Sequence, residues 1–343
     1  MKKLSSPFQL HDQFPTTLRQ RDFIQRARHN VKAIMERRLE KFLIIAGPCS
    51  IHDFSSAMAY ATKLKELAVR VQDTCTIVMR TYIEKPRTRL GWTGLVYDPD
   101  LDGTFDIEEG LSQARKLMLA LTDIEMPIAT ELLHPLSYPY FSDLIAWGCI
   151  GARTVTSQPH RQIASYAPFP MGFKNSVDGN IDLALDAVLC ARKSHNFIGT
   201  DHSGHIAQLH SSGNPNTHII LRGSNKGSNY DIATLRQTQN RIDELDTDCR
   251  ILIDCSHGNC QKCEEKQKEV FLSCLENAVD GSADIMGLML ESHLEKGNQQ
   301  IHAKARPNRS ITDPCIDWDE TESLILWAHQ TLTQGQLASG AAR

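Results

Sequence analysis

The chain contains no stretch that approaches the ~18 consecutive apolar residues of a membrane-spanning helix. Its first residues, Met1-Lys2-Lys3, are not followed by the apolar run of a signal peptide. It also lacks a large excess of charge of either sign, because the net charge is only -4, which argues against a general binder of nucleic acids or membrane surfaces. These absences predict a cytoplasmic protein without nucleic-acid or membrane partners, whose ten cysteines are mostly reduced.

The sequence does contain enough apolar material for a large core. Of its 343 residues, 41% are hydrophobic and 23% are charged, which is ordinary for a globular protein. The length is large for one common domain but suits a single α/β barrel with additions.

The stretch from Lys41 to Asp53, KFLIIAGPCSIHD, gives the first local structure. Its apolar run, Phe42 to Ala46, has the length of a strand buried on both faces and is bounded by Gly47-Pro48. The thiol of Cys49 therefore follows the carboxyl end of a strand, which is where α/β proteins gather their chemistry.

The same pattern of a short apolar run followed by a charged residue recurs along the chain. Strands are predicted at 42–46, 76–80, 127–131, 149–153, 171–174, 218–222, 251–254 and 285–291, and helices at 55–71, 111–121, 141–147, 181–192, 232–245, 262–278 and 321–332. Eight strands with helices between most of them predict an α/β protein with a (β/α)8 TIM barrel. A doubly wound open sheet is the alternative, because a strand count does not prove closure.

Two segments add to this barrel, which we place at residues 41–335. Residues 1–40 form a polar arm with a helical pattern over 17–39, and residues near 196–212 read as an inserted β-hairpin. Neither is needed to close a barrel, so we expect the arm and the hairpin to serve regulation or subunit contacts.

Six cations fall at or just after predicted strand ends. A barrel brings those ends to one mouth, so the cations would converge in a chain of negative net charge, and their mutual repulsion calls for an anionic ligand. A lone cation of this kind is usually a solvated surface charge. The six are Arg80, Lys85, Arg87, Arg153, Lys174 and Arg222.

Four residues could hold a metal ion: Cys49, His257, Glu291 and Asp313. The first three follow predicted strands, and the fourth lies in a late loop. A thiolate, an imidazole and two carboxylates suit Mn, Fe, Co or Zn better than Ca or Mg. Spacing alone does not settle this, since a buried cysteine is often an apolar filler and a lone histidine often a core residue.

A competing metal site is His257-x-x-Cys260-x-x-Cys263. The spacing is similar to that of zinc sites, but it provides only three ligands and runs directly into a charged helix. We therefore interpret Cys260 and Cys263 as ordinary residues.

The motifs GPCSIHD, MRTYIEKPRT, IGARTVTSQPHR, GFKN, ILRG, DCSHGN, ESHLEKGNQ and SITDPCIDWDET together resemble the type I 3-deoxy-arabino-heptulosonate 7-phosphate (DAHP) synthases. The resemblance runs from about Lys41 to Trp327 in family order and is strongest to the tyrosine-sensitive isoenzymes. It implies a barrel with an N-terminal extension and a hairpin. It also implies a transferase that condenses phosphoenolpyruvate with erythrose 4-phosphate and water at the entry to the shikimate pathway of aromatic amino acid biosynthesis.

The resemblance also assigns roles to residues. It implies a divalent metal (Mn, Fe, Co or Zn) on Cys49, His257, Glu291 and Asp313, with Lys85, Cys49 and His257 as catalytic groups. A metal of this kind would polarise the aldehyde, with Lys85 placed to donate a proton. Phosphoenolpyruvate is expected on Arg80, Gly151, Ala152, Arg153, Lys174 and Arg222, and erythrose 4-phosphate on Lys85, Pro86, Arg87 and Thr88.

Feedback inhibition by an aromatic amino acid is a further implication, with tyrosine as the first choice and phenylalanine as the second. Tyr138 and Pro168 depart from the family's usual Pro and Ser, which would reshape the effector cavity. The family also implies a homodimer or homotetramer. The resemblance places the effector near Tyr138, Ala167, Phe197, Gly199 and Leu209.

Two other functions stay open at this stage. A sister enzyme that makes 3-deoxy-octulosonate 8-phosphate would share the barrel and the phosphoenolpyruvate site, although the KPRT motif at 85–88 fits a four-carbon phosphosugar better. A non-catalytic regulator that binds a metal or an aromatic amino acid would need a lost ligand, and none is lost.

Overall fold

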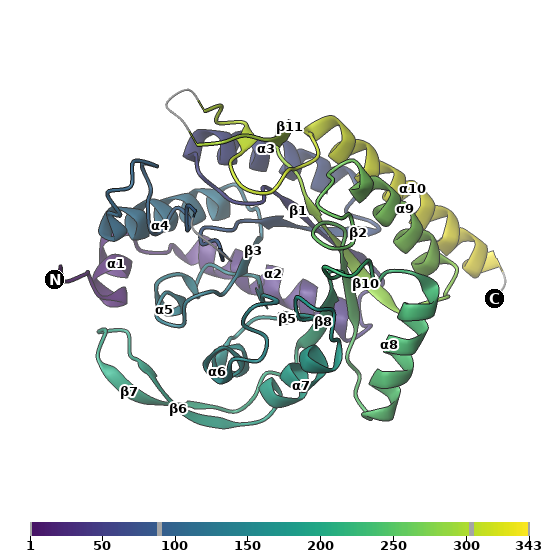
Figure 1. Ribbon diagram of the computed structural model, residues 1–343, viewed down its shortest axis with the longest axis horizontal. Coiled ribbons are helices and arrows are strands. Elements are labelled where there is room, and N and C mark those ends of the chain that lie inside the picture. The colour runs from purple at the N-terminus through teal and green to yellow at the C-terminus, as the bar shows by residue number, and fades with distance from the viewer. Residues whose placement is uncertain (1, 88–90, 302–304, 342–343) are drawn as a thin grey trace.

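Eight parallel strands close into a barrel in the computed structural model, which describes residues 2–87, 91–301 and 305–341 (Figure 1). The order around the barrel is β1-β10-β9-β8-β5-β4-β3-β2, and every neighbouring pair is parallel. This closure confirms the predicted (β/α)8 barrel and excludes the open sheet. The strands are β1 (Phe42–Gly47), β2 (Cys75–Arg80), β3 (Ile128–Glu131), β4 (Trp147–Ile150), β5 (Met171–Lys174), β8 (Thr217–Leu221), β9 (Ile251–Asp254) and β10 (Ile285–Glu291).

Helices alternate with these strands and surround them (Figure 1). Several begin at an acidic residue whose side chain accepts a backbone N–H of the first turn, as at Asp53, Asp106 and Asp231. The helices are α3 (Phe54–Arg70), α4 (Ile107–Asp123), α5 (Tyr138–Phe141), α6 (Gln158–Tyr166), α7 (Asp182–Ala191), α8 (Ile232–Glu244), α9 (Lys266–Val279) and α10 (Trp318–Ala341). In the described part of the chain, no helix is long and apolar enough to cross a membrane.

The interior of the barrel follows from the two-residue period of a strand. In β1, Leu43 and Ile45 point into the barrel, whereas Ile44 and Ala46 pack under the helices. The helix α2 (Leu18–Met35) adds Val31, Ile34 and Met35 to the interior cluster, next to the first residues of the strands. This helix therefore seals the amino-terminal end of the barrel, opposite the end where the predicted site residues lie.

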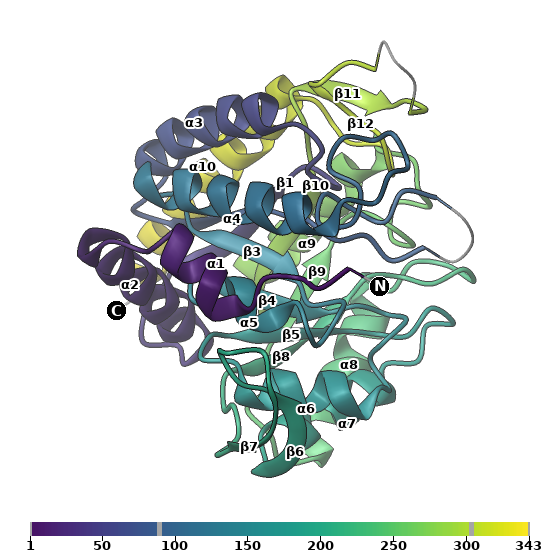
Figure 2. The same ribbon diagram turned by 90° about the vertical axis from the view of Figure 1, so that its left-hand side faces the viewer.

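The inserted hairpin and the arm contact each other. Strands β6 (His195–Thr200) and β7 (Ile206–Ser211) pair antiparallel between α7 and β8, as predicted. The helix α1 (Pro7–Gln13) lies beside α5 and near α4 (Figure 2). The backbone N–H of Phe8 donates to the carbonyl of His202 on the hairpin (2.7 Å). The sequence had not predicted α1.

One predicted helix was wrong. The expected helix at 141–147 is instead the short α5 (Tyr138–Phe141), and β4 begins at Trp147 and ends at Ile150, so 151–153 follow the strand. The reason is that Pro139 starts a helix early, and the apolar residues that follow, from Leu144 to Ile150, are buried on all sides and carry no helical period. The sequence also missed α6 and the short strands β11 (Glu295–Asn298) and β12 (Arg309–Ser310).

Candidate active site

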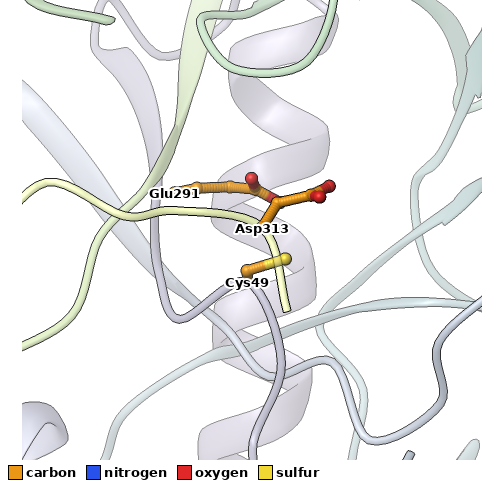
Figure 3. Close-up of side chains that lie close together, drawn as sticks. All are labelled: Cys49, Glu291 and Asp313. Carbon is orange, nitrogen blue, oxygen red and sulfur yellow. The ribbon is translucent and has the colours of Figure 1, made fainter. Parts of the chain in front are cut away.

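Three of the four predicted metal ligands converge at the carboxyl end of the barrel (Figure 3). Cys49 follows β1, Glu291 ends β10, and Asp313 lies in the loop after β12. One ligand atom from each lies within 4.8 Å of the other two. The Cys49 and Glu291 side chains are buried, and Asp313 is half-buried, so the group lies in a site shielded from bulk water.

His257, the fourth predicted ligand, lies beside this group. Its Nε2 is 3.8 Å from Oε1 of Glu291, and its Nδ1 is 2.9 Å from Oδ2 of Asp254. Its backbone adopts a left-handed conformation with φ of 57°, which is uncommon for a residue other than glycine, although histidine adopts it more often than most. A carboxylate on Nδ1 leaves Nε2 directed at Glu291, which is the usual arrangement of a metal-binding histidine.

Lys85 connects the metal group to the anion site. Its Nζ lies 3.2 Å from Sγ of Cys49 and 3.0 Å from the Cys49 carbonyl. Burial alone would lower the pKa of this amine, but Cys49 and Glu291 outweigh burial and raise it. Burial, with help from Glu291, raises the pKa of the Cys49 thiol. The ammonium group of Lys85 therefore lies where it offsets the negative charge of the nearby Glu291 and Asp313 carboxylates.

A polar cavity of about 330 Å³ opens next to the metal group. Of the residues predicted to bind substrates, eight line it, and Thr88 lies outside the described residues. The described lining consists of Lys85, Pro86, Arg87, Glu131, Gly151, Ala152, Arg153, Lys174, Arg222, His257, Lys262 and Asp313.

The remaining predicted cation, Arg80, is fully buried and does not line this cavity. Its Nη2 lies 2.6 Å from Oε1 of Glu291, and its guanidinium carbon lies 3.6 Å from the ring centre of Tyr82. The ring of Tyr82 is also within 6.0 Å of the ammonium groups of Lys85 and Lys174. A buried aromatic face thus stabilises three cations that would otherwise repel one another.

Sequence reasoning missed two acids in this region, Glu131 and Asp254. Glu131 ends β3 and lines the anion cavity, and Asp254 ends β9 and contacts both His257 and Lys174. A Cβ atom on Gly151 would lie 2.0 Å from Oε1 of Glu131, so a larger residue at 151 would require the Glu131 side chain to move. The signal was available, because both acids end predicted strands just as the cations do.

The structure does not support the competing metal site at His257, Cys260 and Cys263. Among the described residues, His257, Cys260 and Cys263 do not form a compact ligand group. Cys260 is buried, and its Sγ contacts the carbonyl of His257 instead (3.7 Å).

A second, larger cavity of about 850 Å³ lies between α5, α6 and the hairpin. Four of the residues predicted to bind an effector line it: Tyr138, Phe197, Gly199 and Leu209. The fifth, Ala167, is buried, and its neighbour Pro168 lines the cavity instead. Aromatic rings form part of the wall, since Tyr166 makes edge-on contacts with Tyr138 and Phe197.

The fold and this site define a class of protein. A closed parallel barrel that brings a thiol, an imidazole, carboxylates and several cations to the carboxyl ends of its strands is built as an enzyme for anionic substrates. Comparison with known families makes the identification specific. Residues 23–325 match the DAHP synthetase I family, and the chain belongs to that family.

Known relatives and a solved structure agree with this identification. The chain is 42% identical over 342 residues to the Tyr-sensitive phospho-2-dehydro-3-deoxyheptonate aldolase of Escherichia coli K12, covering 99% of this chain and 96% of the relative. It is also 42% identical over 328 residues to the Trp-sensitive enzyme of the same strain, covering 95% and 94%. A phospho-2-dehydro-3-deoxyheptonate aldolase from Francisella tularensis superposes with a TM-score of 0.95 at 38% identity, covering 97% of this chain and 98% of that one. The resemblance found in the sequence is confirmed, but identity hardly separates the tyrosine-sensitive from the tryptophan-sensitive relatives.

Proposed function

We propose that this chain is a DAHP synthase, which condenses phosphoenolpyruvate with erythrose 4-phosphate and water to give DAHP and phosphate. In this reaction C3 of the enol phosphate bonds to the aldehyde carbon, water adds at C2, and phosphate leaves by cleavage of its bond to C2. The observation that carries the proposal is the anion cavity, where Lys85, Arg87, Arg153, Lys174, Arg222 and Lys262 surround a space next to the metal group.

The cavity divides between two anionic substrates. Arg153 follows β4, Lys174 ends β5 and Arg222 follows β8, so they form one wall of the barrel mouth, which suits phosphoenolpyruvate. The backbone of Gly151 and Ala152 belongs to the same wall. Lys85, Pro86 and Arg87 follow β2 on the other side, which suits the phosphate of erythrose 4-phosphate. Arg80 lies outside this lining and contributes indirectly, through its buried ion pair with Glu291.

The donor set of the metal group fits a divalent ion of intermediate softness. Cys49, Glu291 and Asp313 provide sulfur and oxygen within reach of one another, and His257 adds nitrogen at the edge. A bound ion of this kind would supply a Lewis acid for the aldehyde oxygen of the second substrate. The buried carboxylate of Asp254 fixes His257 through Nδ1 for this role.

The chain itself supplies charge and protons. Lys85 Nζ lies between Cys49 and the anion cavity, so it is placed to give a proton to the oxygen that develops charge as the carbon–carbon bond forms. The arginines stabilise the phosphate as it leaves, because their donor geometry matches phosphate oxygens.

The test is a reaction of the purified protein with phosphoenolpyruvate and each of two aldose phosphates. We expect phosphate release and DAHP formation with erythrose 4-phosphate and none with arabinose 5-phosphate. Turnover with arabinose 5-phosphate alone would assign the chain to the sister reaction. Absence of turnover with both, in protein reloaded with metal, would leave a non-catalytic binder.

We further propose that the 850 Å³ cavity binds an aromatic amino acid that inhibits the enzyme, with tyrosine as the first choice and phenylalanine as the second. The cavity is lined mainly by apolar and aromatic side chains, and Asp201 and His202 provide polar groups among the lining residues. It adjoins the hairpin and the arm, which a barrel does not need for closure.

We propose a homodimer or homotetramer for the assembly. Ile198 and Ile206 on the hairpin are 83% and 82% exposed, and Phe8 on α1 is 61% exposed. Three large apolar side chains on adjoining additions to the barrel suit a contact with a second copy of the chain. Light scattering of the purified protein checks the subunit number.

A further inference from the structure

Three asparagines behind the anion cavity form one connected group, which we call the amide cluster. Asn175 follows β5, Asn229 lies between β8 and α8, and Asn259 lies in the loop after β9. Their side chains are almost completely buried, with 0%, 7% and 4% of the residue surface exposed. None of the three is among the described residues that line the anion cavity.

The amide cluster joins three loops through its own side chains. Asn229 donates from Nδ2 to Oδ1 of Asn175 (3.1 Å) and from its backbone N–H to Oδ1 of Asn259 (2.9 Å). Its Oδ1 accepts the backbone N–H of Gly223 (2.7 Å). Asn229 therefore connects the loop after β5 to the loops after β8 and β9.

The other hydrogen bonds of the cluster reach the residues that carry the cavity. Oδ1 of Asn175 accepts the backbone N–H of Arg222 (2.9 Å), and its Nδ2 donates to the carbonyl of Gly223 (3.0 Å). Asn259 donates from Nδ2 to the carbonyls of Leu221 (3.1 Å) and Asp254 (2.9 Å). Each of the three side-chain amides thus has a partner for both its oxygen and its nitrogen, and a buried polar network that is satisfied in this way is rigid.

The backbones of the loops after β8 and β9 are also in close contact, which restricts the movement of one loop relative to the other. Gly223 has a φ of 68°, and a Cβ atom on it would lie 2.4 Å from the backbone nitrogen of Asn259. A Cβ atom on Gly258 would lie 2.4 Å from the backbone nitrogen of Ser224. The N–H of Gly258 donates to the carbonyl of Arg222 (3.0 Å). The backbone of Arg222 is therefore held on one side by Asn175 and on the other by Gly258.

We propose that the amide cluster is the positioning device for the phosphoenolpyruvate wall, fixing Arg222 and, through the residue next to it, Lys174 at one separation. This rests on the proposed function, which assigns that wall to phosphoenolpyruvate. Asn175 directly follows Lys174 and bonds to the backbone of Arg222, so its loss frees both cations at once. The wall formed by Lys85 and Arg87 follows β2 and has no hydrogen bond to the cluster among those of the described residues, so it should be unaffected.

The opposing interpretation is that the cluster only stabilises the loops. Asn214 provides a matched control, because its side chain is also buried and hydrogen-bonded to backbone groups. Its Nδ2 donates to three carbonyls, and its Oδ1 accepts the N–H of Asn216. It lies before β8, at the opposite end of that strand from Arg222. Replacing Asn214 should therefore reduce stability without changing the affinity for either substrate.

The test compares Asn175→Ala, Asn229→Ala and Asn229→Ser with Asn214→Ala. For each variant, Tm, the Kd of phosphoenolpyruvate by calorimetry and the KM of both substrates are measured. We expect the cluster variants to raise the Kd and KM of phosphoenolpyruvate on the order of ten- to hundredfold, as small misplacements of binding groups do, while the KM of erythrose 4-phosphate stays within about twofold. Asn214→Ala should lower Tm comparably and leave both KM values unchanged.

Two outcomes would overturn the inference. One is a set of cluster variants that lose stability but keep the wild-type Kd of phosphoenolpyruvate, and the other is an equal rise of both KM values. If the alanine variants do not fold, Asn229→Ser decides, since the exposed fraction of Asn229 is the largest of the three and serine keeps a polar side chain there. Wild-type turnover in the same assay tests the proposed function separately, so a failure of either can be told from a failure of the other.

Discussion

Oδ2 of Asp254 lies 2.9 Å from Nδ1 of His257, and the same oxygen lies 2.9 Å from Nζ of Lys174. One buried carboxylate therefore orients a proposed metal ligand and a proposed phosphoenolpyruvate ligand together. Burial alone would raise the pKa of Asp254, but His257 and Lys174 outweigh burial and hold the pKa well below its ordinary value. Asp254 is therefore ionised at neutral pH, and its negative charge can hold both His257 and Lys174.

The first prediction concerns this carboxylate. Asp254→Asn keeps the shape of the side chain but removes the charge that fixes His257, so metal affinity should fall by about ten- to a hundredfold. Competition with a chromogenic chelator measures this affinity directly. Asp284→Asn is the control, because Asp284 contacts Arg37 and Arg250 just before β10, at the end of the barrel away from the site. Equal metal affinities in Asp254→Asn and the wild type would contradict the role given to Asp254.

The second prediction is dependence on a metal. Chelation should abolish turnover, and Mn, Fe, Co or Zn should restore it, because the donor set combines sulfur, nitrogen and oxygen. Cys49→Ala should fold, since a buried alanine is tolerated in place of a small thiol, but it should be almost inactive. Full activity of metal-free Cys49→Ala would show that the group of Cys49, Glu291 and Asp313 does not serve catalysis.

The third prediction separates the two walls of the anion cavity. Arg222 is half-buried in the wall of the anion cavity, so Arg222→Ala leaves a bound phosphate short of a charged partner at a cost of roughly 2–5 kcal/mol. At about 1.4 kcal/mol per decade, kcat/KM for phosphoenolpyruvate should fall on the order of thirty- to several-thousand-fold. Arg87→Ala should act mainly on erythrose 4-phosphate. If steady-state kinetics showed Arg87→Ala weakening only phosphoenolpyruvate, the division of the cavity would be wrong.

The strands and many residues of the candidate site could be predicted from the sequence, because both follow from local sequence patterns. A strand buried on both faces, such as Phe42 to Gly47, is a continuous apolar run, and the residue that follows it is fixed at the barrel mouth. This reasoning located Cys49 and the cations Lys174 and Arg222. It failed at 141–147, where burial rather than periodicity decides the structure.

The supporting contacts could not be predicted, because they join residues that are far apart in the chain. Nothing in the sequence around Asn175 indicates that it meets Asn229 and Arg222, or that Glu84 faces Ser137. The packing of α2 against the amino-terminal end of the barrel could not be predicted either. An amphipathic pattern predicts that one face of a helix is buried, but it does not identify the part of the protein that covers this face.

The fourth prediction concerns Glu84, which directly precedes Lys85. Its carboxylate accepts hydrogen bonds from Tyr97 (3.1 Å) and Ser137 (3.0 Å), but burial prevails and raises its pKa to about 7. Between the ordinary value of 4.5 and about 7, the folded chain binds this proton more tightly than the unfolded chain. The free energy of unfolding should therefore fall as pH rises through this window and level off above it.

Glu84→Gln isolates this effect, because glutamine does not titrate. Relative to Glu84→Gln, the wild type should lose up to ~3 kcal/mol of stability between pH 5 and pH 8, at about 1.4 kcal/mol per pKa unit. Urea denaturation at several pH values measures the difference. A difference between the two proteins that stays constant with pH would contradict the raised pKa.

The last prediction concerns inhibition through the 850 Å³ cavity. Tyrosine, phenylalanine and tryptophan are titrated separately at sub-saturating substrate, and tyrosine should inhibit most strongly, with a coupling of ~1–3 kcal/mol between the two sites. Deleting residues 1–30 would be a poor test, because Phe23, Ile24 and Ala27 on α2 belong to the core and their removal would expose its apolar surface. A substitution that fills the cavity with a larger side chain is a more specific test.

Leu209→Trp places a large ring in the cavity, because Leu209 lines it and faces Gly199 across the hairpin. This variant should lose inhibition and keep the wild-type kcat, since the metal group and the anion cavity are untouched. Gln208→Trp adds the same ring to the opposite, exposed face of β7 and should remain inhibited, provided that light scattering shows an unchanged subunit number, because Ile198 and Ile206 lie on this face. Indifference of the wild type to all three amino acids at millimolar concentration would leave the hairpin and arm with a structural role only. Equal inhibition of Leu209→Trp and the wild type would place the effector elsewhere on the protein.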